Sequence, residues 1–425
     1  MRYVSTRGGA APVGLSAAIA AGLAPDGGLY VPERMPRIGA PPLDGYLAGT
    51  AVRMLEPFFE GDALAPELPA ICAEAFAFPA PRRELRIDGA HLLELFHGPT
   101  AAFKDFGARF LAACLRRLRG AADRPLTILV ATSGDTGAAV GAAFHRVPGM
   151  RVAILYPDNR VSPRQAHQLG SFGDNVRALR VEGSFDDCQR LVKGALGDAD
   201  LQAAVPMSSA NSISLGRLLP QMAYFGHASL HANGRMHTIV PTGNLGNAIA
   251  CLWARELGLP IGDVVFACNA NDTLPEFYAG LPYRPRDAVS TIANAMDVGA
   301  PSNFERLRHL FGSDEATRRS GQAQSVDDAE IRATIHRHAA SDGEVFCPHT
   351  AAGVRVFERL RLAGDRREWT IAATAHPAKF ESIVEPLIGR RVEVPEVLEA
   401  MLLRPASAEP MAADGRTFAD WLRGW

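Results

Sequence analysis

Lysine is the scarcest charged residue in this chain of 425 residues: of 44 basic residues only three are lysine, namely Lys104, Lys193 and Lys379. Where a positive charge alone is needed, the protein uses arginine. A lysine can lose its proton and act as a nucleophile, whereas an arginine stays charged. Each lysine therefore marks a position where amine chemistry can be required, with ordinary compositional drift as the alternative.

Cysteines are also few, and no two of the six have the C-x-x-C spacing of a zinc or redox site. Six in 425 residues are too sparse for a disulfide scaffold, so we expect inert thiols in a reducing compartment and no metal centre. The charge has no excess of one sign, because 44 basic and 46 acidic residues leave a net charge of −2. This balance argues against a nucleic-acid partner, since binding a polyanion needs clustered cations.

Long apolar runs are missing as well, because none reaches the roughly 18 residues of a membrane span. An alanine-rich segment, 15–24, faintly imitates a secretory signal, but it lacks a clean cleavage pattern and leads directly into the turn-like Asp26–Gly28. A hydrophobic content of 47% with 21% charged residues is typical of soluble globular proteins. We therefore expect a cytoplasmic protein without a membrane partner.

Short apolar runs alternate with helix-like stretches from about residue 126 onward. Strands of this length between amphipathic helices indicate βαβ units and mainly parallel sheets. The strands predicted in this way are 126–131, 151–156, 176–181, 236–240, 263–268 and 369–373.

We predict an α/β protein with two doubly wound, mainly parallel sheet domains and an N-terminal subdomain. Prolines after residue 78 punctuate the chain, so we place the subdomain at 1–82 and the two α/β blocks at 83–230 and 231–425. The stretch 280–365 is expected to be mostly helical, and the tail after Arg404 to be a loop that ends in an amphipathic segment.

The glycine-rich loop Thr242–Asn247 lies between a predicted strand and a helix. In doubly wound sheets ligands bind at the carboxyl ends of the strands, where helix N-termini offer unpaired N–H groups and a positive dipole. The spacing is G-x-x-G, which is neither the dinucleotide fingerprint nor a P-loop. The loop is a candidate phosphate cradle, and an ordinary tight turn is the alternative.

A second loop, Ser133–Gly137, occupies the equivalent place after another predicted strand. It offers hydroxyls, a carboxylate and backbone donors at a helix start, and a substrate carboxylate fits such a position. Asp135 has a second interpretation, as a plain N-cap of the helix.

Lys104 lies early in a predicted helix between Phe103 and Phe106. Burial beside aromatic rings lowers the pKa of an amine, which suits Schiff-base formation. The alternative is a solvated helix lysine paired with Asp105.

The remaining candidates are two lysines and a polar segment. Lys193 falls on the polar side of an amphipathic helix and is interpreted as a surface residue, whereas Lys379 is the rival amine. The segment Asn211–Arg217 combines small polar groups with a guanidinium, as a phosphate ester requires, and N-capping plus a surface arginine is its alternative. One reactive amine and several anion sites together suit a phosphorylated aldehyde cofactor and an anionic substrate.

Further motifs extend along the chain, including Leu23–Pro32, Asn294–Gly299 with Pro301–Phe304, and Thr374–Phe380. With these motifs and the loops above, the chain resembles threonine synthases over nearly its whole length. These are pyridoxal-phosphate enzymes of fold type II, the group of the tryptophan synthase β-subunit. The last two motifs are specific to threonine synthases within that group.

The resemblance implies that pyridoxal 5'-phosphate is the cofactor and that Lys104 is the catalytic residue, which holds it as a Schiff base. The cofactor-binding residues that it implies are Lys104, Phe103, Asp135, Gly243, Asn244, Leu245, Gly246, Asn247 and Thr374. The substrate-binding residues that it implies are Ser133, Thr136, Asn211, Ser212 and Arg217. Two positions depart from the family pattern, since Asp135 stands where relatives often have Asn, and Leu245 where Phe is common.

The implied reaction converts O-phospho-L-homoserine and water into L-threonine and phosphate, by γ-elimination followed by β-addition of water. The resemblance also implies a monomer. A related lyase that eliminates phosphate and releases a 2-oxo acid and ammonia is the first alternative. A non-catalytic, nucleotide-binding Rossmann-like protein is the second, although the chain lacks both nucleotide fingerprints.

Overall fold

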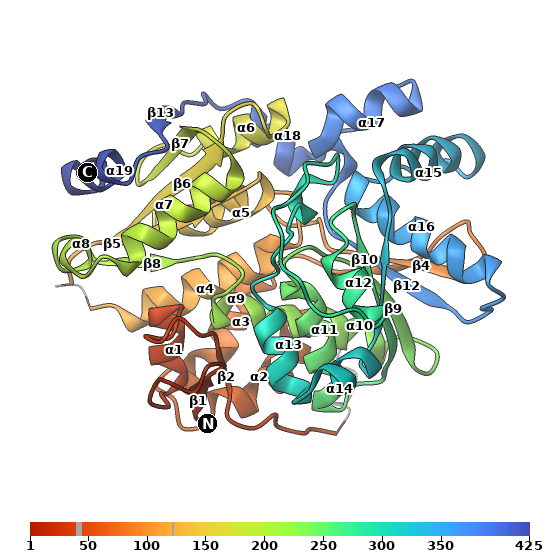
Figure 1. The fold of residues 1–425 in the computed structure, drawn as a ribbon, viewed down its shortest axis with the longest axis horizontal. Coiled ribbons are helices and arrows are strands. Elements are labelled where there is room, and N and C mark those ends of the chain that lie inside the picture. Colours follow the sequence, from red (N-terminus) through yellow and green to blue (C-terminus); the bar gives the residue numbers. More distant parts are fainter. Residues whose placement is uncertain (40–44, 121–122) are drawn as a thin grey trace.

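The computed structural model describes residues 1–39, 45–120 and 123–425, and it contains a two-stranded ribbon and two larger sheets (Figure 1). The larger sheets lie in different parts of the molecule, and helices surround each of them. The predicted α/β class with mainly parallel sheets is confirmed.

The first large sheet has six strands, and all neighbours are parallel except β4 and β3. In spatial order the strands are β11 (Gln322–Ser325), β10 (Ile261–Cys268), β9 (Met236–Pro241), β12 (Trp369–Ala373), β4 (Ala90–Glu94) and β3 (Arg82–Glu84). Every residue of the central strand β12 is buried. A parallel strand covered on both faces reads as a continuous apolar run, which is why the sequence reveals it.

The second large sheet has five strands, all parallel. In spatial order they are β13 (Glu409–Ala412), β7 (Val176–Glu182), β6 (Met150–Pro157), β5 (Leu126–Ala131) and β8 (Met207–Ser209). All six strands predicted from the sequence are present in the two sheets, with ends that differ by at most two residues.

The sheets do not follow the linear blocks 83–230 and 231–425. Strands β3 and β4 precede residue 230 but pair within the six-stranded sheet, and β13 lies near the C-terminus but pairs with β7. Long-range pairing decides this membership, and no local pattern reports it. The tail after Arg404 was expected to be a loop, and the strand β13 corrects this: only Met411 of its four residues is buried, so it has no apolar run.

The N-terminal part consists of an antiparallel ribbon and three helices that pack against α4 and α10. Its elements are β1 (Tyr3–Ser5), α1 (Leu15–Ala21), β2 (Tyr30–Pro32), α2 (Leu47–Phe59), η1 (Ala65–Glu67) and α3 (Leu68–Ala75). The helices that follow along the chain, up to residue 230, are α4 (Lys104–Leu118), α5 (Asp135–Phe144), α6 (Pro163–Gly170), α7 (Phe185–Gly197), α8 (Ala199–Ala204), α9 (Leu215–Leu218) and α10 (Gln221–Leu230).

The stretch 280–365 is mostly helical, as predicted, and also contains the short edge strand β11. The remaining helices are α11 (Gly246–Leu257), α12 (Thr273–Tyr278), η2 (Asn294–Met296), α13 (Phe304–Phe311), α14 (Asp314–Arg319), α15 (Asp328–Ser341), α16 (Pro348–Leu362), η3 (Pro377–Phe380), α17 (Glu381–Ile388), α18 (Glu396–Leu402) and α19 (Gly415–Gly424). Across the described ranges, no helix has the length and apolarity to span a membrane.

Candidate active site

The loops that follow five strands meet at one cavity of about 290 Å³. Strands β4, β12 and β9 are neighbours in one sheet, and β5 and β8 are neighbours in the other. Ligands of parallel α/β sheets bind at such carboxyl ends. The predicted site residues that line the cavity are Phe103, Lys104, Ser133, Asp135, Thr136, Asn211, Ser212, Arg217, Gly243, Asn244, Leu245, Gly246, Asn247 and Thr374.

Lys104 begins α4 and is partly exposed to this cavity. The segment before it runs beside the segment after β12, where the Phe103 amide donates to the Thr374 carbonyl over 2.9 Å. Burial lowers the pKa of Lys104 to about 8; Arg217 also lowers it, and Asp135 opposes both. The neutral amine is therefore accessible near neutral pH.

The alternative of a solvated Lys104 paired with Asp105 is wrong. Asp105 is buried and accepts from the Thr100 amide (2.8 Å) and the Thr100 hydroxyl (2.7 Å), so it closes the turn that leads into α4. The aromatic environment also differs from the expectation. The Phe103 ring centre lies 5.8 Å from the Lys104 ammonium, but Phe106 packs against Phe78 instead.

The loop between β9 and α11 presents five consecutive unpaired N–H groups, those of Gly243–Asn247: within the described residues none of them donates a hydrogen bond to the protein. Leu245 has a left-handed backbone (φ 64°), which costs a non-glycine residue about 1 kcal/mol. Successive N–H groups at such a turn, followed by a helix N-terminus, form a concave anion site. The geometry favours a phosphate cradle over an ordinary tight turn.

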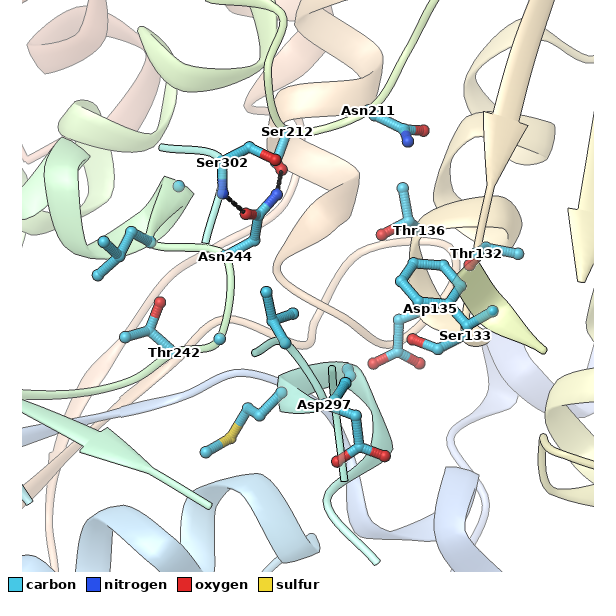
Figure 2. A pocket seen from close by; sticks show the side chains of 18 of the residues that line it. Thr132, Ser133, Asp135, Thr136, Asn211, Ser212, Thr242, Asn244, Asp297 and Ser302 are labelled. Atoms are coloured by element: carbon cyan, nitrogen blue, oxygen red, sulfur yellow. Dashed lines mark hydrogen bonds between the residues drawn. The ribbon is translucent and has the colours of Figure 1, made fainter. Parts of the chain in front are cut away.

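The two Asn side chains of this loop have structural partners. The Asn244 carboxamide donates to the Ser212 hydroxyl and accepts from the Ser302 amide, each over 2.6 Å (Figure 2). Asn247 accepts from the Thr242 hydroxyl over 2.8 Å and donates to the Pro241 carbonyl over 2.9 Å. The loop therefore offers backbone groups, while its side chains fix its shape and hold Ser212.

The loop after β5 faces these residues across the cavity, where Ser133, Asp135 and Thr136 point inward (Figure 2). The Thr132 hydroxyl accepts from the amides of Gly134 (3.0 Å) and Gly137 (2.9 Å) and so caps the turn. Within the described residues, the hydroxyls of Ser133 and Thr136 and the amides of Asp135 and Thr136 at the start of α5 remain free for a ligand.

Asp135 is not the N-cap of α5, because that position belongs to Gly134 and the Asp135 carboxylate points elsewhere. Its Oδ1 lies 2.8 Å from the Lys379 ammonium and accepts from the Gln165 amide nitrogen over 3.0 Å. Burial alone would raise the pKa of Asp135, but Lys379 and Lys104 together hold it well below its usual range. Asp135 is an ionised acceptor.

Arg217 is 2% exposed, so the alternative of a surface arginine is wrong. One guanidinium nitrogen donates to the Ala210 carbonyl, while the buried Nε has no partner among the described residues. Burial lowers the pKa of Arg217 to about 10, so it stays charged at neutral pH. In the same part of the chain, the buried Asn211 Oδ1 and Ser214 hydroxyl also lack a partner. Unpaired buried polar groups around a cation are costly, unless an anionic ligand binds there.

Lys193 is exposed, as predicted, but it also lines the cavity. Phe185, Gln189 and Lys193 stand four residues apart on α7 and so share one helix face. Lys379, the rival amine, is fully buried behind Asp135 and does not belong to the lining residues.

Sequence reasoning gave no role to several residues of the cavity wall, and Asn294 and His349 are two of them. Asn294 donates to the Ser133 carbonyl (3.2 Å), and His349 accepts from the Ala295 amide (3.1 Å). Burial lowers the pKa of His349 to about 4, so the ring is neutral. Asn294 stood in a quoted motif without an assigned role, whereas no local pattern singles out His349.

Comparison with known proteins identifies the class of this site. Residues 78–375 match the family model described as "Pyridoxal-phosphate dependent enzyme". Together with a cavity that combines a lysine amine and a phosphate cradle, this match defines a pyridoxal-phosphate-dependent lyase, and the predicted cofactor is confirmed.

More particularly, residues 2–76 match the model "Threonine synthase N terminus", and residues 350–420 match "Threonine synthase, C-terminal". Threonine synthase of Haemophilus influenzae is 38% identical over 411 residues, which cover 95% of each chain. The crystal structure of threonine synthase from Escherichia coli has a TM-score of 0.91 at 35% identity and covers 100% of both chains. The PLP-bound threonine synthase of Brucella melitensis has a TM-score of 0.91 at 34% identity, over 100% of this chain and 99% of that one. The chain belongs to the threonine synthase family.

Proposed function

We propose that the protein converts O-phospho-L-homoserine and water into L-threonine and phosphate. The observation that carries this proposal is a count of anion sites: one cavity joins Lys104 to three donor sets, which are the 243–247 amides, the 133–136 loop and the Arg217 group. Cofactor phosphate, substrate carboxylate and substrate phosphate are three anions, so each donor set has one occupant.

The cofactor phosphate belongs on the unpaired amides of Gly243–Asn247. When bound, pyridoxal phosphate supplies an electron sink for the substrate's carbon atoms. Thr374 directly follows β12 beside the Lys104 segment, and its neutral hydroxyl would face the ring nitrogen. Asp135 offers an ionised acceptor for the cofactor's 3-hydroxyl, where an Asn could also donate.

The substrate carboxylate would bind the hydroxyls of Ser133 and Thr136 and the free amides at the start of α5. The substrate phosphate would bind Asn211, Ser212 and Arg217, where a charged guanidinium and unpaired polar groups converge. Arg217 stabilises the phosphate as it leaves.

Lys104 is the base. With the cofactor and substrate in place, the Lys104 amine would remove the substrate's protons at Cα and Cβ, because a pKa near 8 keeps a useful neutral fraction at neutral pH. Loss of the Cβ proton lets phosphate leave from Cγ. One proton then returns to Cγ, water adds its hydroxyl at Cβ, and the other proton returns to Cα, while the released phosphate takes the remaining proton of the water.

Product analysis tests the reaction. Purified protein incubated with O-phospho-L-homoserine is expected to release threonine and phosphate in equal amounts, detected by chromatography and phosphate assay. Phosphate with a 2-oxo acid and ammonia would instead favour the phosphate-eliminating lyase. A colourless protein that binds NAD or ATP would favour the nucleotide-binding alternative.

Gly243→Ala is expected to weaken cofactor binding at least about tenfold, because a Cβ there would lie 2.7 Å from Met296 Cα and push the cradle apart. Titration of the full-length protein with pyridoxal phosphate, followed by absorbance, measures the affinity. Gly246→Ala is the matched control, since its Cβ would meet Ser212 Cβ at an ordinary 3.4 Å. Equal losses in both variants would contradict the proposed fit of the cradle.

Lys193→Glu is expected to raise KM for the phosphorylated substrate about fivefold at low salt and to leave kcat unchanged, because the exposed ammonium at the cavity attracts a dianion. The effect should fade near 0.5 M salt, where the Debye length is about 4 Å, compared with about 30 Å at 10 mM. Arg190→Glu, on the same helix but paired with Asp187 and outside the cavity lining, serves as control. A salt-independent change would argue against steering.

We further propose that the enzyme acts as a monomer in the cytoplasm, as its resemblance to the longer bacterial and fungal threonine synthases implies. Light scattering coupled to size-exclusion chromatography should give the mass of one chain, and cell fractionation should recover the activity with cytoplasmic markers.

A further inference from the structure

The second buried amine of the molecule belongs to Lys379, which is 0% exposed. Its ammonium lies 2.8 Å from Asp135 Oδ1 and donates to the Thr100 carbonyl over 2.7 Å. Lys379 comes from η3, after β12 of the six-stranded sheet, and Asp135 begins α5, after β5 of the five-stranded sheet. The ion pair therefore joins the two halves of the molecule directly behind the cavity wall.

We propose that Lys379 is a positioning residue, the fixed counter-ion that keeps Asp135 an ionised hydrogen-bond acceptor on the cavity wall and thereby sets the electrostatic surroundings of Lys104. The inference rests on the proposed function in one respect only, namely that Lys104 is the amine that binds the cofactor.

The bonding of Asp135 shows how this arrangement works. Lys379 and Gln165 both contact Oδ1, and within the described residues nothing donates to Oδ2. Oδ2 therefore remains available to a ligand in the cavity that Asp135 lines. A buried carboxylate without a cation would take up a proton and become a donor at one oxygen. With Lys379 in place it stays an acceptor at both oxygens.

The charged groups around Lys104 show why the ionisation state of Asp135 matters for its pKa. Arg217 from α9 and Lys379 from η3 are cations, whereas Asp135 from α5 is the anion among the groups acting on Lys104. His349 from α16 also lies near both lysines but is neutral. Removing Lys379 should therefore leave Asp135 protonated and neutral. Because the Asp135 anion acts on Lys104 more strongly than Lys379 does, its loss should lower the pKa of Lys104, as Asp135→Asn should also do.

The experiment measures cofactor capture and needs no substrate. Full-length protein freed of cofactor is mixed with limiting pyridoxal phosphate at a series of pH values between about 6 and about 10 and then reduced with borohydride. Intact mass spectrometry gives the fraction of protein that carries the cofactor at each pH. With only three lysines in the chain, background labelling is low. The midpoint, which is the pH at which half of the maximal labelling is reached, is expected near pH 8 for the wild-type protein. Both Lys379→Met and Asp135→Asn should move the midpoint down by about one unit, because each removes the Asp135 charge that raises the pKa of Lys104.

The double variant Lys379→Met with Asp135→Asn completes the test, because it replaces the ion pair with neutral groups. Its midpoint should also lie below that of wild type, because the Asp135 charge is absent. The single variant Lys379→Met should also lower Tm by about 5 °C or more, since it leaves a buried carboxylate without its counter-ion, and the double variant should recover most of that loss.

Ser162→Ala is the matched control for simple loosening of η3. The Ser162 hydroxyl donates to the Lys379 carbonyl over 2.7 Å and carries no charge. This variant should lower Tm without moving the midpoint. An unmoved or raised midpoint in Lys379→Met would mean that Asp135 stays ionised without Lys379, and it would overturn the inference. Failure of the proposed function looks different: Lys104→Ala would then still capture cofactor.

Discussion

Lys104→Ala is expected to abolish the visible absorbance of bound cofactor and to reduce threonine formation by at least about a thousandfold. The reason is that Lys104 is the amine that lines the cavity next to the phosphate cradle, and that burial lowers its pKa to about 8. The variant loses both covalent attachment and the base, and a positioned base alone contributes roughly 10²–10⁴-fold. Absorbance spectra and product assays on the same preparation measure the two losses.

Lys193→Ala is the control for loss of an amine, because this residue lies at the exposed part of the cavity. It should keep the absorbance band. Borohydride reduction followed by peptide mass mapping should place the cofactor on the peptide that contains Lys104. A band that survives in Lys104→Ala would move the attachment to Lys379 and refute the assignment.

Arg217→Ala is expected to raise KM for O-phospho-L-homoserine about 100-fold, and to change the affinity for pyridoxal phosphate by less than about threefold. The guanidinium is buried and charged, and its Nε has no partner among the described residues; a charge-assisted bond to phosphate is worth about 1.5–3 kcal/mol. Gly107 of α4 leaves room for Arg217, since a Cβ there would lie 2.8 Å from the Arg217 carbonyl. Steady-state kinetics and cofactor titration separate the two quantities.

Arg109→Met controls for the loss of a partly buried arginine on α4 itself. Its guanidinium donates to the Glu74 carbonyl over 3.0 Å, far from the lining residues, so this variant should lower Tm and leave KM unchanged. Equal losses of substrate and cofactor affinity in Arg217→Ala would contradict a role for Arg217 in holding substrate phosphate.

Much of the fold could be predicted because its buried parallel strands are short continuous apolar runs. Segments such as Leu126–Ala131 and Trp369–Ala373 are covered on both faces, so their composition alone reveals them. The strands that were missed are short or partly exposed, as in Arg82–Glu84 and Gln322–Ser325, where no residue is fully buried. For these strands, pairing with a distant partner rather than local composition decides the structure.

The candidate site could be predicted to a similar extent. Glycine-rich turns after strands and the scarcity of lysine identified the loops and Lys104, because these are local properties. The environment of each side chain could not be predicted. The solvated alternative for Lys104 failed because its supposed partner Asp105 is buried and bonded to Thr100, and the surface alternative for Arg217 failed because that side chain is buried. Burial depends on contacts between distant segments.

By itself, the sequence determined which functional groups are available: one amine at a helix start, two strand-to-helix turns rich in glycine and hydroxyls, and an arginine among small polar residues. These follow from residue type and from spacings of a few positions. Only the tertiary structure decided that Lys379 lies behind Asp135 rather than in the cavity, and that β4 joins β12 while β13 joins β7. Such pairings join residues more than 200 positions apart, and they are selected by the burial of whole faces, which no local pattern contains.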